Sequence, residues 1–136
     1  MHEANGAATV WPVLLYRDAA KAIDWLVEAF GLTRNLVVPD DGGRIVHAEL
    51  GWRGGVITLG GYDEDAAFSN LKPGGGAVYL VAADPDARFA RATAAGAEVV
   101  RPLKDEDYGS RTFTVRDLEG NSWTFGTYGG AAPPQA

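Results

Sequence analysis

The segment NSWTFGTY (121–128) contains the pattern Thr-apolar-Gly-x-Tyr, which also occurs at residues 58–62 as TLGGY. The offset between the two copies is 66 residues in a chain of 136. A pattern that returns after about half of the chain is typical of an internally duplicated domain. The two copies therefore predict one structural unit that occurs twice and ends each time in the same strand.

The first unit follows the order strand, helix, strand, strand, strand. An apolar run at 9–16 (TVWPVLLY) predicts the first strand, and Asp18 is a suitable N-cap for the helix after it. Apolar residues recur at helical spacing as far as Phe30, and Gly31 has the position of a C-terminal glycine. Three further strands are expected, separated by glycine-rich turns, at 36–39, 44–52 and 56–62.

The same order returns in the second half of the chain. A strand at 77–83 precedes Asp84 as the cap and Pro85 as the first helical residue, and the helix runs to Gly96. The strands that follow are expected at 98–103, 111–117 and 122–128, with LEGN (118–121) as a tight turn. The sequence thus predicts a single α+β domain (1–136) of two βαβββ modules in tandem, module 1 at 9–62, module 2 at 77–128, and a linker at 63–76.

Alternation along the strands predicts which side of each sheet a residue faces. Phe113 and Val115 are apolar and are expected to face the helices, so Thr112 and Thr114 face away. Arg44 and Arg111 are 67 residues apart, and this offset carries the alternation into module 1. It places Ile45, His47 and Glu49 on the outer side and Val46, Ala48 and Leu50 on the helix side.

The final strands of the modules follow the same rule. Thr58 and Thr124 are expected to face away from the helices, on the side of each sheet that holds both polar and apolar residues. We call this side the mixed face. It is the candidate for a cavity.

Composition excludes several classes of function. With 46% apolar and 22% charged residues the chain is typical of a soluble globular protein. No apolar run reaches the roughly 18 residues of a membrane span, and the N-terminus lacks signal-peptide features, so a cytoplasmic location is expected. There is no cysteine, hence no thiolate nucleophile. The net charge of −6 disfavours nucleic acid as a partner.

These features resemble the vicinal oxygen chelate superfamily, which includes glyoxalase I, the extradiol dioxygenases and the bleomycin-resistance proteins. The resemblance is carried by YRDAAKAIDWLVEAFGL (16–32), DEDYGSRTFTVRDLEGNSWTFGTY (105–128) and the repeat, and it extends from about residue 9 to 128. It implies sheets that curl into a cup, often completed by a homodimer. The linker allows a module to be exchanged between chains.

The resemblance also indicates where a metal would bind. The metal enzymes of the superfamily place one ligand in the first strand and one in the last strand of each module, usually His and Glu. In this chain those positions are Trp11, Thr58, Ala77 and Thr124. Indole, methyl and neutral hydroxyl groups are poor ligands for metals that prefer imidazole or carboxylate. We therefore expect no metal site and no cofactor.

Several side chains are candidates for contact with a ligand. Aromatic rings can stack on it, threonine hydroxyls can donate hydrogen bonds, and either Arg111 or Arg116 can hold a carboxylate or carbonyl group. The acidic runs at 63–65 and 105–107 favour a cationic ligand if they border the cleft, and are otherwise solvated surface. The predicted ligand-binding set is Trp11, Leu15, His47, Glu49, Trp52, Thr58, Tyr79, Tyr108, Arg111, Thr114 and Thr124.

The expected function is that of a metal-free binding protein that sequesters an aromatic or peptide antibiotic, as in the antibiotic-binding branch of the superfamily. The alternative is a glyoxalase-like lyase or isomerase, or a dioxygenase relative, that uses His47 and Glu49. These residues lie two apart and share a strand face. A third possibility is an interaction module whose cup is filled by its own side chains.

Overall fold

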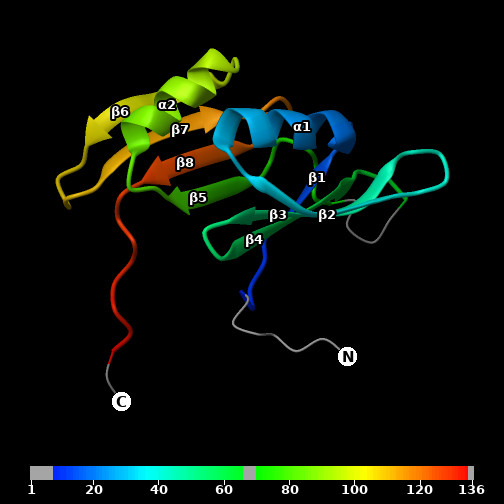
Figure 1. Cartoon of the computed structure of the whole chain (residues 1–136), viewed down its shortest axis with the longest axis horizontal. Helices are drawn as coiled ribbons and strands as arrows, with labels where there is room; N and C mark the ends of the chain where they lie inside the picture. Colours follow the sequence, from blue (N-terminus) through cyan, green and yellow to red (C-terminus); the bar gives the residue numbers. More distant parts are fainter. Residues whose placement is uncertain (1–7, 66–69, 135–136) are drawn as a thin grey trace.

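The computed structural model describes residues 8–65 and 70–134 and contains the two predicted βαβββ modules (Figure 1). Module 1 consists of β1 (Val13–Tyr16), α1 (Ala19–Phe30), β2 (Thr33–Pro39), β3 (Ile45–Trp52) and β4 (Gly55–Gly61). Module 2 consists of β5 (Ala77–Val81), α2 (Pro85–Ala94), β6 (Glu98–Asp105), β7 (Arg111–Arg116) and β8 (Ser122–Gly126). Part of the predicted linker, residues 66–69, lies outside the described residues.

Each module forms a four-stranded mixed sheet, in the orders β1-β4-β3-β2 and β5-β8-β7-β6. The first strand of each module runs parallel to the last one, and the other neighbours are antiparallel. Val13 lies opposite Thr58, and Tyr79 lies opposite Thr124. This equivalent pairing confirms the offset of 66 residues and the α+β class.

Helix α1 begins and ends where the sequence predicts. The Asp18 carboxylate accepts the backbone N–H of Lys21 at 3.1 Å. Gly31 has a φ of 77° and donates its N–H to the carbonyl of Val27 at 3.0 Å. Glycine adopts this left-handed conformation without a steric penalty, which ends the helix at Phe30.

The carboxyl end of α1 is capped by arginines of α2. Arg91 donates to the carbonyl oxygens of Glu28 and Val27 at 2.7 and 3.2 Å, and Arg88 lies 3.5 Å from that of Phe30. Carbonyls in the last turn of a helix lack donors from the helix itself, and this end carries partial negative charge. The carbonyl of Val27 accepts from Gly31 as well as from Arg91. The two helices thereby join the two modules, and Figure 1 shows them side by side above the sheets.

The modules share one apolar core. Phe30 of α1 packs against Trp123 and Phe125 of β8, with ring centroids 5.1 and 5.2 Å apart. Phe125 in turn stacks on Phe113 of β7 at 4.9 Å. Since Phe30 of module 1 packs against β8 of module 2, neither half buries its apolar side alone.

A buried carboxylate also links the modules. Asp117 accepts the hydroxyl of Tyr16 from β1 at 2.5 Å and the indole N–H of Trp123 from β8 at 2.9 Å. The backbone N–H groups of Glu119 and Asn121 donate to its other oxygen at 2.9 and 3.1 Å. Burial and the adjacent charge of Asp117 raise the pKa of Tyr16 above its ordinary value of 10.0. The phenol is therefore a hydrogen-bond donor at neutral pH.

The predicted faces are wrong at the start of β3. Ile45 is 7% exposed and Val46 is 53% exposed, the reverse of the expected alternation. Val38 and Pro39 of β2 pair with His47 and Ile45, which leaves Val46 as an extra residue on β3. Such a β-bulge reverses the alternation on one side of it. Beyond the bulge Ala48 and Leu50 are buried, as predicted.

The offset of 67 between β3 and β7 is also wrong. Glu49 pairs with Thr58, and Thr114 pairs with Thr124. Glu49 is therefore the counterpart of Thr114 rather than of Arg116. Beyond the bulge the predicted faces are correct in spite of this error, because residues two apart on a strand point to the same side.

Candidate ligand-binding site

The mixed face of module 2 carries a concavity of about 340 Å³. All four strands of this sheet contribute to it, together with the turn between β6 and β7. It contains four of the predicted ligand-binding residues, Tyr79, Tyr108, Thr114 and Thr124. Its complete lining consists of these four and of Ala77, Val78, Arg101, Glu106 and Thr112.

Threonines form the hydrogen-bonding part of this concavity. Thr114 and Thr124 lie directly opposite each other on β7 and β8, with their hydroxyl oxygens 2.7 Å apart. In such a pair one hydroxyl donates to the other, and the second still has a hydrogen to offer to a further acceptor. Thr112, one row along β7, is buried. β-Branched side chains have few rotamers in a strand, so these hydroxyls are held in place.

Tyrosine rings border the same concavity. Tyr79 is 44% exposed, and its hydroxyl donates to the carbonyl of Tyr128 at 2.7 Å. Tyr79 crosses β8 at Gly126, where a Cβ would lie 2.5 Å from its hydroxyl oxygen. Tyr108 meets the ring of Tyr128 edge to face at 6.0 Å. The glycine thus gives Tyr79 the space to lie flat over the sheet.

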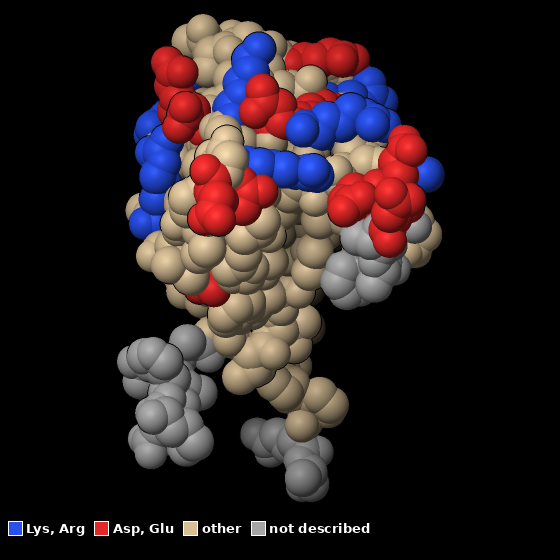
Figure 2. All heavy atoms as spheres, turned by 90° about the vertical axis from the view of Figure 1, so that its right-hand side faces the viewer, with Lys and Arg blue, Asp and Glu red and all other residues tan. Residues whose placement is uncertain are grey.

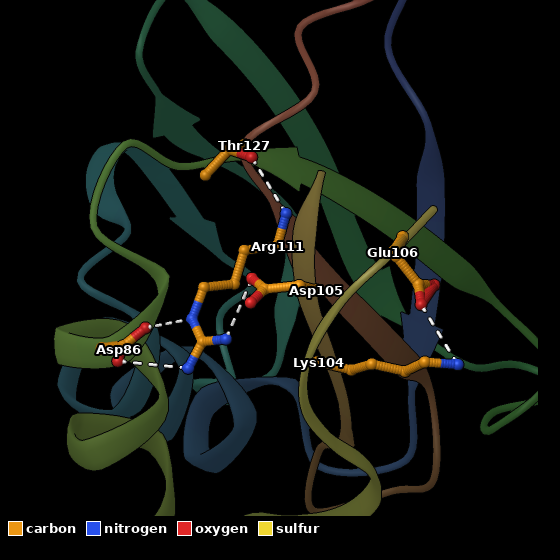
Figure 3. Close-up of polar contacts among 6 residues, drawn as sticks. All are labelled: Asp86, Lys104, Asp105, Glu106, Arg111 and Thr127. Atoms are coloured by element: carbon orange, nitrogen blue, oxygen red, sulfur yellow. Dashed lines mark hydrogen bonds and ion pairs between the residues drawn. The ribbon is translucent and has the colours of Figure 1, made fainter. Parts of the chain in front are cut away.

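A charged group lies at the rim of the concavity. Glu106 is only 11% exposed along its side chain and lies 3.4 Å from Arg101 Nη2 and 3.6 Å from Lys104 Nζ. Figure 3 shows Lys104 and Glu106 extended toward each other. Glu106 belongs to the acidic run at 105–107, for which the sequence left open either solvated surface or a border of the cleft. Arg101 was missed because β6 shifts register on both sides of it, so alternation does not predict its side.

A second hollow adjoins the first. This groove, of about 430 Å³, runs between the β3–β4 hairpin and β5, and it shares Val78 and Tyr79 with the concavity of module 2. Its walls are mostly apolar and include Val10, Pro12, Trp52, Val56 and Val81. The two hollows therefore meet at Val78 and Tyr79.

Trp52, like Tyr79, is a predicted ligand-binding residue that lines this groove. Its indole N–H donates to the carbonyl of Val81 at 2.9 Å, and its ring meets Phe125 edge to face at 5.8 Å. The guanidinium of Arg88 lies over the same ring at 4.8 Å. These contacts from module 2 hold the hairpin of module 1 against β5.

The mixed face of module 1 holds a second group of predicted residues. His47 Nε2 and Glu49 Oε2 are 2.9 Å apart, and Glu49 lies opposite Thr58 on β4. Leu15 of β1 lies one row further, opposite Gly60. None of these four side chains lines the two hollows described above. The structure therefore divides the predicted set between two faces.

Arg111, the predicted partner for a carboxylate, is bound to carboxylates of the chain itself. Its guanidinium lies between Asp86 of α2, at 2.7 Å, and Asp105 of β6, at 3.1 Å (Figure 3). The hydrogen bond from Arg111 holds the pKa of Asp86 below its ordinary value, and the two carboxylates raise the pKa of Arg111. Arg116 makes an ion pair with Glu98 at 2.8 Å.

Trp11 lies before β1 rather than within the strand predicted at 9–16. It is 40% exposed, and its indole N–H donates to the carbonyl of Ala8 at 2.7 Å. The strand begins only at Val13, directly after Pro12, whose carbonyl accepts the N–H of Thr58. Trp11 is thus a neighbour of the groove and not one of its lining residues.

The four positions that the resemblance implies for metal ligands, Trp11, Thr58, Ala77 and Thr124, do not hold side chains suited to a divalent metal. The strand partners of Thr58 and Thr124 are Val13 and Tyr79, two positions beyond Trp11 and Ala77. Neither the observed nor the predicted partners offer an imidazole or carboxylate. Across residues 8–65 and 70–134, no three His, Asp or Glu side chains are arranged to hold a metal ion.

Charge is unevenly distributed over the surface. Figure 2 shows charged side chains gathered around the helix-bearing upper half, whereas the lower half of that view is largely uncharged.

Within the described part of the chain, no helix has the length and apolar character needed to cross a membrane.

Comparison with known proteins agrees with this architecture. A family model, the glyoxalase/bleomycin resistance protein/dioxygenase superfamily, matches residues 9–125. An uncharacterized protein of Mycobacterium tuberculosis is 36% identical over 121 residues, which cover 85% of this chain and 71% of that protein.

Solved structures extend the comparison. TioX from Micromonospora sp. ML1 is 36% identical and superposes with a TM-score of 0.74 over 88% of this chain and 98% of TioX. TnmS3 from Streptomyces sp. CB03234, an antibiotic binding protein, has a TM-score of 0.71 at 22% identity, over 91% of this chain and 97% of TnmS3. The likeness to TnmS3 shows a shared fold.

Proposed function

Since the chain belongs to the glyoxalase/bleomycin resistance protein/dioxygenase superfamily, we propose that it binds and sequesters an aromatic or peptide antibiotic without the help of a metal ion. The ligand occupies the concavity of module 2 and extends past Tyr79 into the apolar groove. Binding then needs no bond in the ligand to break. The role follows the function of TnmS3, which shares the fold and binds an antibiotic.

The observation that carries this proposal is the combination of two adjoining hollows with different chemistry. One offers tyrosine rings and the Thr114–Thr124 hydroxyl pair, and the other offers apolar walls and Trp52. Small-molecule sites are typically apolar hollows of about 300–1,000 Å³ with a few well-placed polar groups. The two hollows have volumes of about 340 and 430 Å³, which suits a ligand of several rings.

We propose in addition that two copies associate as a homodimer. The mixed face of module 1 exposes the apolar side chains Val13, Leu36, Val38 and Val46. Exposed apolar residues that gather on one sheet face are typical of an interaction surface. In this dimer the second copy supplies the wall opposite His47, Glu49 and Thr58. Only with that wall do these three side chains lie near a ligand.

The binding function is tested by a thermal-shift titration with bleomycin, a peptide antibiotic, and daunorubicin, a polyaromatic one. We expect at least one of them to raise the melting temperature, since a ligand at 100 times its dissociation constant adds about 2.7 kcal/mol of stability. Tyr108→Ala should weaken binding by the loss of one aromatic contact, about 0.5–1.5 kcal/mol.

Leu118→Ala is the matched control, because Leu118 is also exposed but lies in the turn before β8, outside both hollows. It should leave binding unchanged. If neither drug nor related peptide and polyaromatic antibiotics shift the transition, the proposed function is wrong.

One observation favours an enzymatic alternative. His47 and Glu49, joined by a hydrogen bond of 2.9 Å, are the candidate acid–base pair of a glyoxalase-like isomerase or a dioxygenase relative. The assay is formation of lactoylglutathione from methylglyoxal and glutathione, with the protein loaded with nickel or zinc. Turnover that is lost in His47→Ala would establish this alternative in place of the binding role.

A further inference from the structure

We infer that the concavity of module 2 selects a planar ligand that carries acceptor oxygens on one edge, a carboxylate or a row of carbonyl groups, and binds them through Arg101 and the Thr114–Thr124 pair. This inference rests on the proposed binding function and names the chemical class of its ligand. It differs from the sequence-based expectation in two ways. The positively charged residue that binds the ligand is Arg101 and not Arg111 or Arg116. The acidic run at 105–107 does not make the concavity a site for cationic ligands.

The first argument is the balance of donors and acceptors. Arg101 lies on β6 opposite Thr114, so its side chain and the hydroxyl pair belong to adjacent strands of one concavity. A guanidinium presents planar N–H donors that match a carboxylate, and the hydroxyl pair keeps one hydrogen for an outside acceptor. The polar groups near the floor therefore favour a ligand rich in acceptor oxygens.

The second argument is the position of Glu106. Its side chain is 11% exposed, while those of Arg101 and Lys104 are 60% and 65% exposed. The carboxylate lies between the two cations at 3.4 and 3.6 Å, beyond the usual length of a charge-assisted hydrogen bond. Glu106 is thus a positioning residue that keeps Arg101 at the rim. Arg101 and Glu106 are the charged residues of the lining and balance each other, and Lys104 beside them adds a further positive charge.

The third argument concerns the ion pair of the neighbouring residue Asp105. Asp105 precedes Glu106 in the acidic run, but its carboxylate lies 3.1 Å from Arg111 on the α2 side (Figure 3). Asp105 is absent from the lining of the concavity, and so is Arg111. The negative charge of Asp105 is therefore neutralised outside the site, and Asp107 is also absent from the lining.

The fourth argument concerns the flat shape of the ligand. Tyr79 lies over Gly126, and Tyr108 is exposed beside the concavity. Both rings border the same space as the Thr114–Thr124 pair. A planar molecule can stack on a ring while its edge reaches the donors, which a bulky aliphatic molecule cannot do.

Three fluorescent probes with one ring system test the inference: 1-pyrenecarboxylate, neutral 1-pyrenemethanol and cationic 1-pyrenemethylamine. We expect the carboxylate to bind at least about tenfold more tightly than the amine, measured by fluorescence anisotropy. In the Arg101→Gln variant this preference should fall to less than about twofold, and the variant should still bind the neutral probe.

Arg116→Gln is the matched control. It removes the same charge from β7, where Arg116 pairs with Glu98 outside the concavity, and should keep the preference. Melting temperatures of both variants establish that they fold. Equal loss of preference in the two variants would indicate a long-range charge effect and overturn the inference. Tighter binding of the amine would overturn it too, while leaving the binding function intact. Failure of all three probes and of both antibiotics would contradict the binding function itself.

Discussion

The two repeated threonines explain much of the chemistry of the mixed faces. Thr58 lies opposite Val13 and Glu49, whereas Thr124 lies opposite Tyr79 and Thr114. A hydroxyl beside an apolar or aromatic partner can hydrogen-bond a ligand, but it is a poor ligand for a divalent metal. Because Glu49 and Thr114 occupy equivalent positions, the mixed face of module 1 has a carboxylate where that of module 2 has a hydroxyl.

The buried Tyr16 predicts a pH dependence of stability. Its pKa is raised above 10.0 in the folded protein, so folding favours the neutral phenol. This stabilisation is complete below pH 10 and is lost as the pH rises further, because the unfolded phenol ionises while the folded one keeps its proton. The free energy of unfolding should therefore fall more steeply in wild type than in Tyr16→Phe, by about 1.4 kcal/mol per pH unit.

Urea unfolding at pH values from neutral to alkaline measures both slopes. At neutral pH, Tyr16→Phe should itself be less stable by about 1.5–3 kcal/mol, because Asp117 loses a donor in a buried site. Tyr108→Phe, at an exposed position, is the control and should behave as wild type. Parallel slopes for wild type and Tyr16→Phe would show that Tyr16 is not shielded from water.

Among the secondary-structure elements, the two helices depend on each other. Helix α1 ends at Phe30, before Gly31, and the arginines that bind its last carbonyls come from α2. Strand β3 likewise depends on β2, since the bulge at Val46 exists only in that pairing. The ends and irregularities of these elements are therefore set by neighbours that are distant in the sequence.

Removing the cap supplied by α2 should cost stability. Arg91→Met keeps most of the side-chain length but loses the hydrogen bonds to Glu28 and Val27, at an expected cost of about 1–2 kcal/mol. Arg34→Met, which removes an exposed ion pair with Asp24, should cost less than about 1 kcal/mol. Chemical denaturation of both variants gives the comparison. Equal losses would mean that the cap contributes no more than a surface charge.

For the molecule as a whole, the arrangement of the modules determines which surface stays exposed. The helix sides merge into one core, so both mixed faces are left for ligands or partners. Module 2 forms a hollow on its face, while module 1 presents apolar side chains around Val46. The same βαβββ unit thus occurs twice with two different surfaces.

The proposed homodimer gives a direct prediction. Light scattering coupled to size exclusion should give twice the chain mass of 14.4 kDa for the wild type. Val46→Glu places a charge within the exposed apolar face and should shift the protein to the monomer. Leu118→Glu, an equally apolar and exposed position in the turn before β8, should remain dimeric. A wild-type protein with the mass of one chain would contradict the proposal.

Regular features of this fold are predictable from sequence because they depend on neighbouring residues. The repeat, the Asp18 cap, the Gly31 terminus and the alternation in β7 all follow from local spacing, and the structure confirms them. The family resemblance on 16–32 and 105–128 adds the architecture and is likewise confirmed.

The composition of the site depends on contacts between distant residues. Arg111 binds Asp86 and Asp105, while Arg101 lines the concavity, and nothing in the spacing of the two arginines distinguishes them. Register shifts in β6 and the bulge in β3 change the side on which residues emerge. Periodicity is a property of the local sequence, whereas the partners of a long polar side chain depend on which strands and helices meet in space. For that reason the fold could be inferred from the chain alone, and the set of residues that line the hollow required the folded molecule.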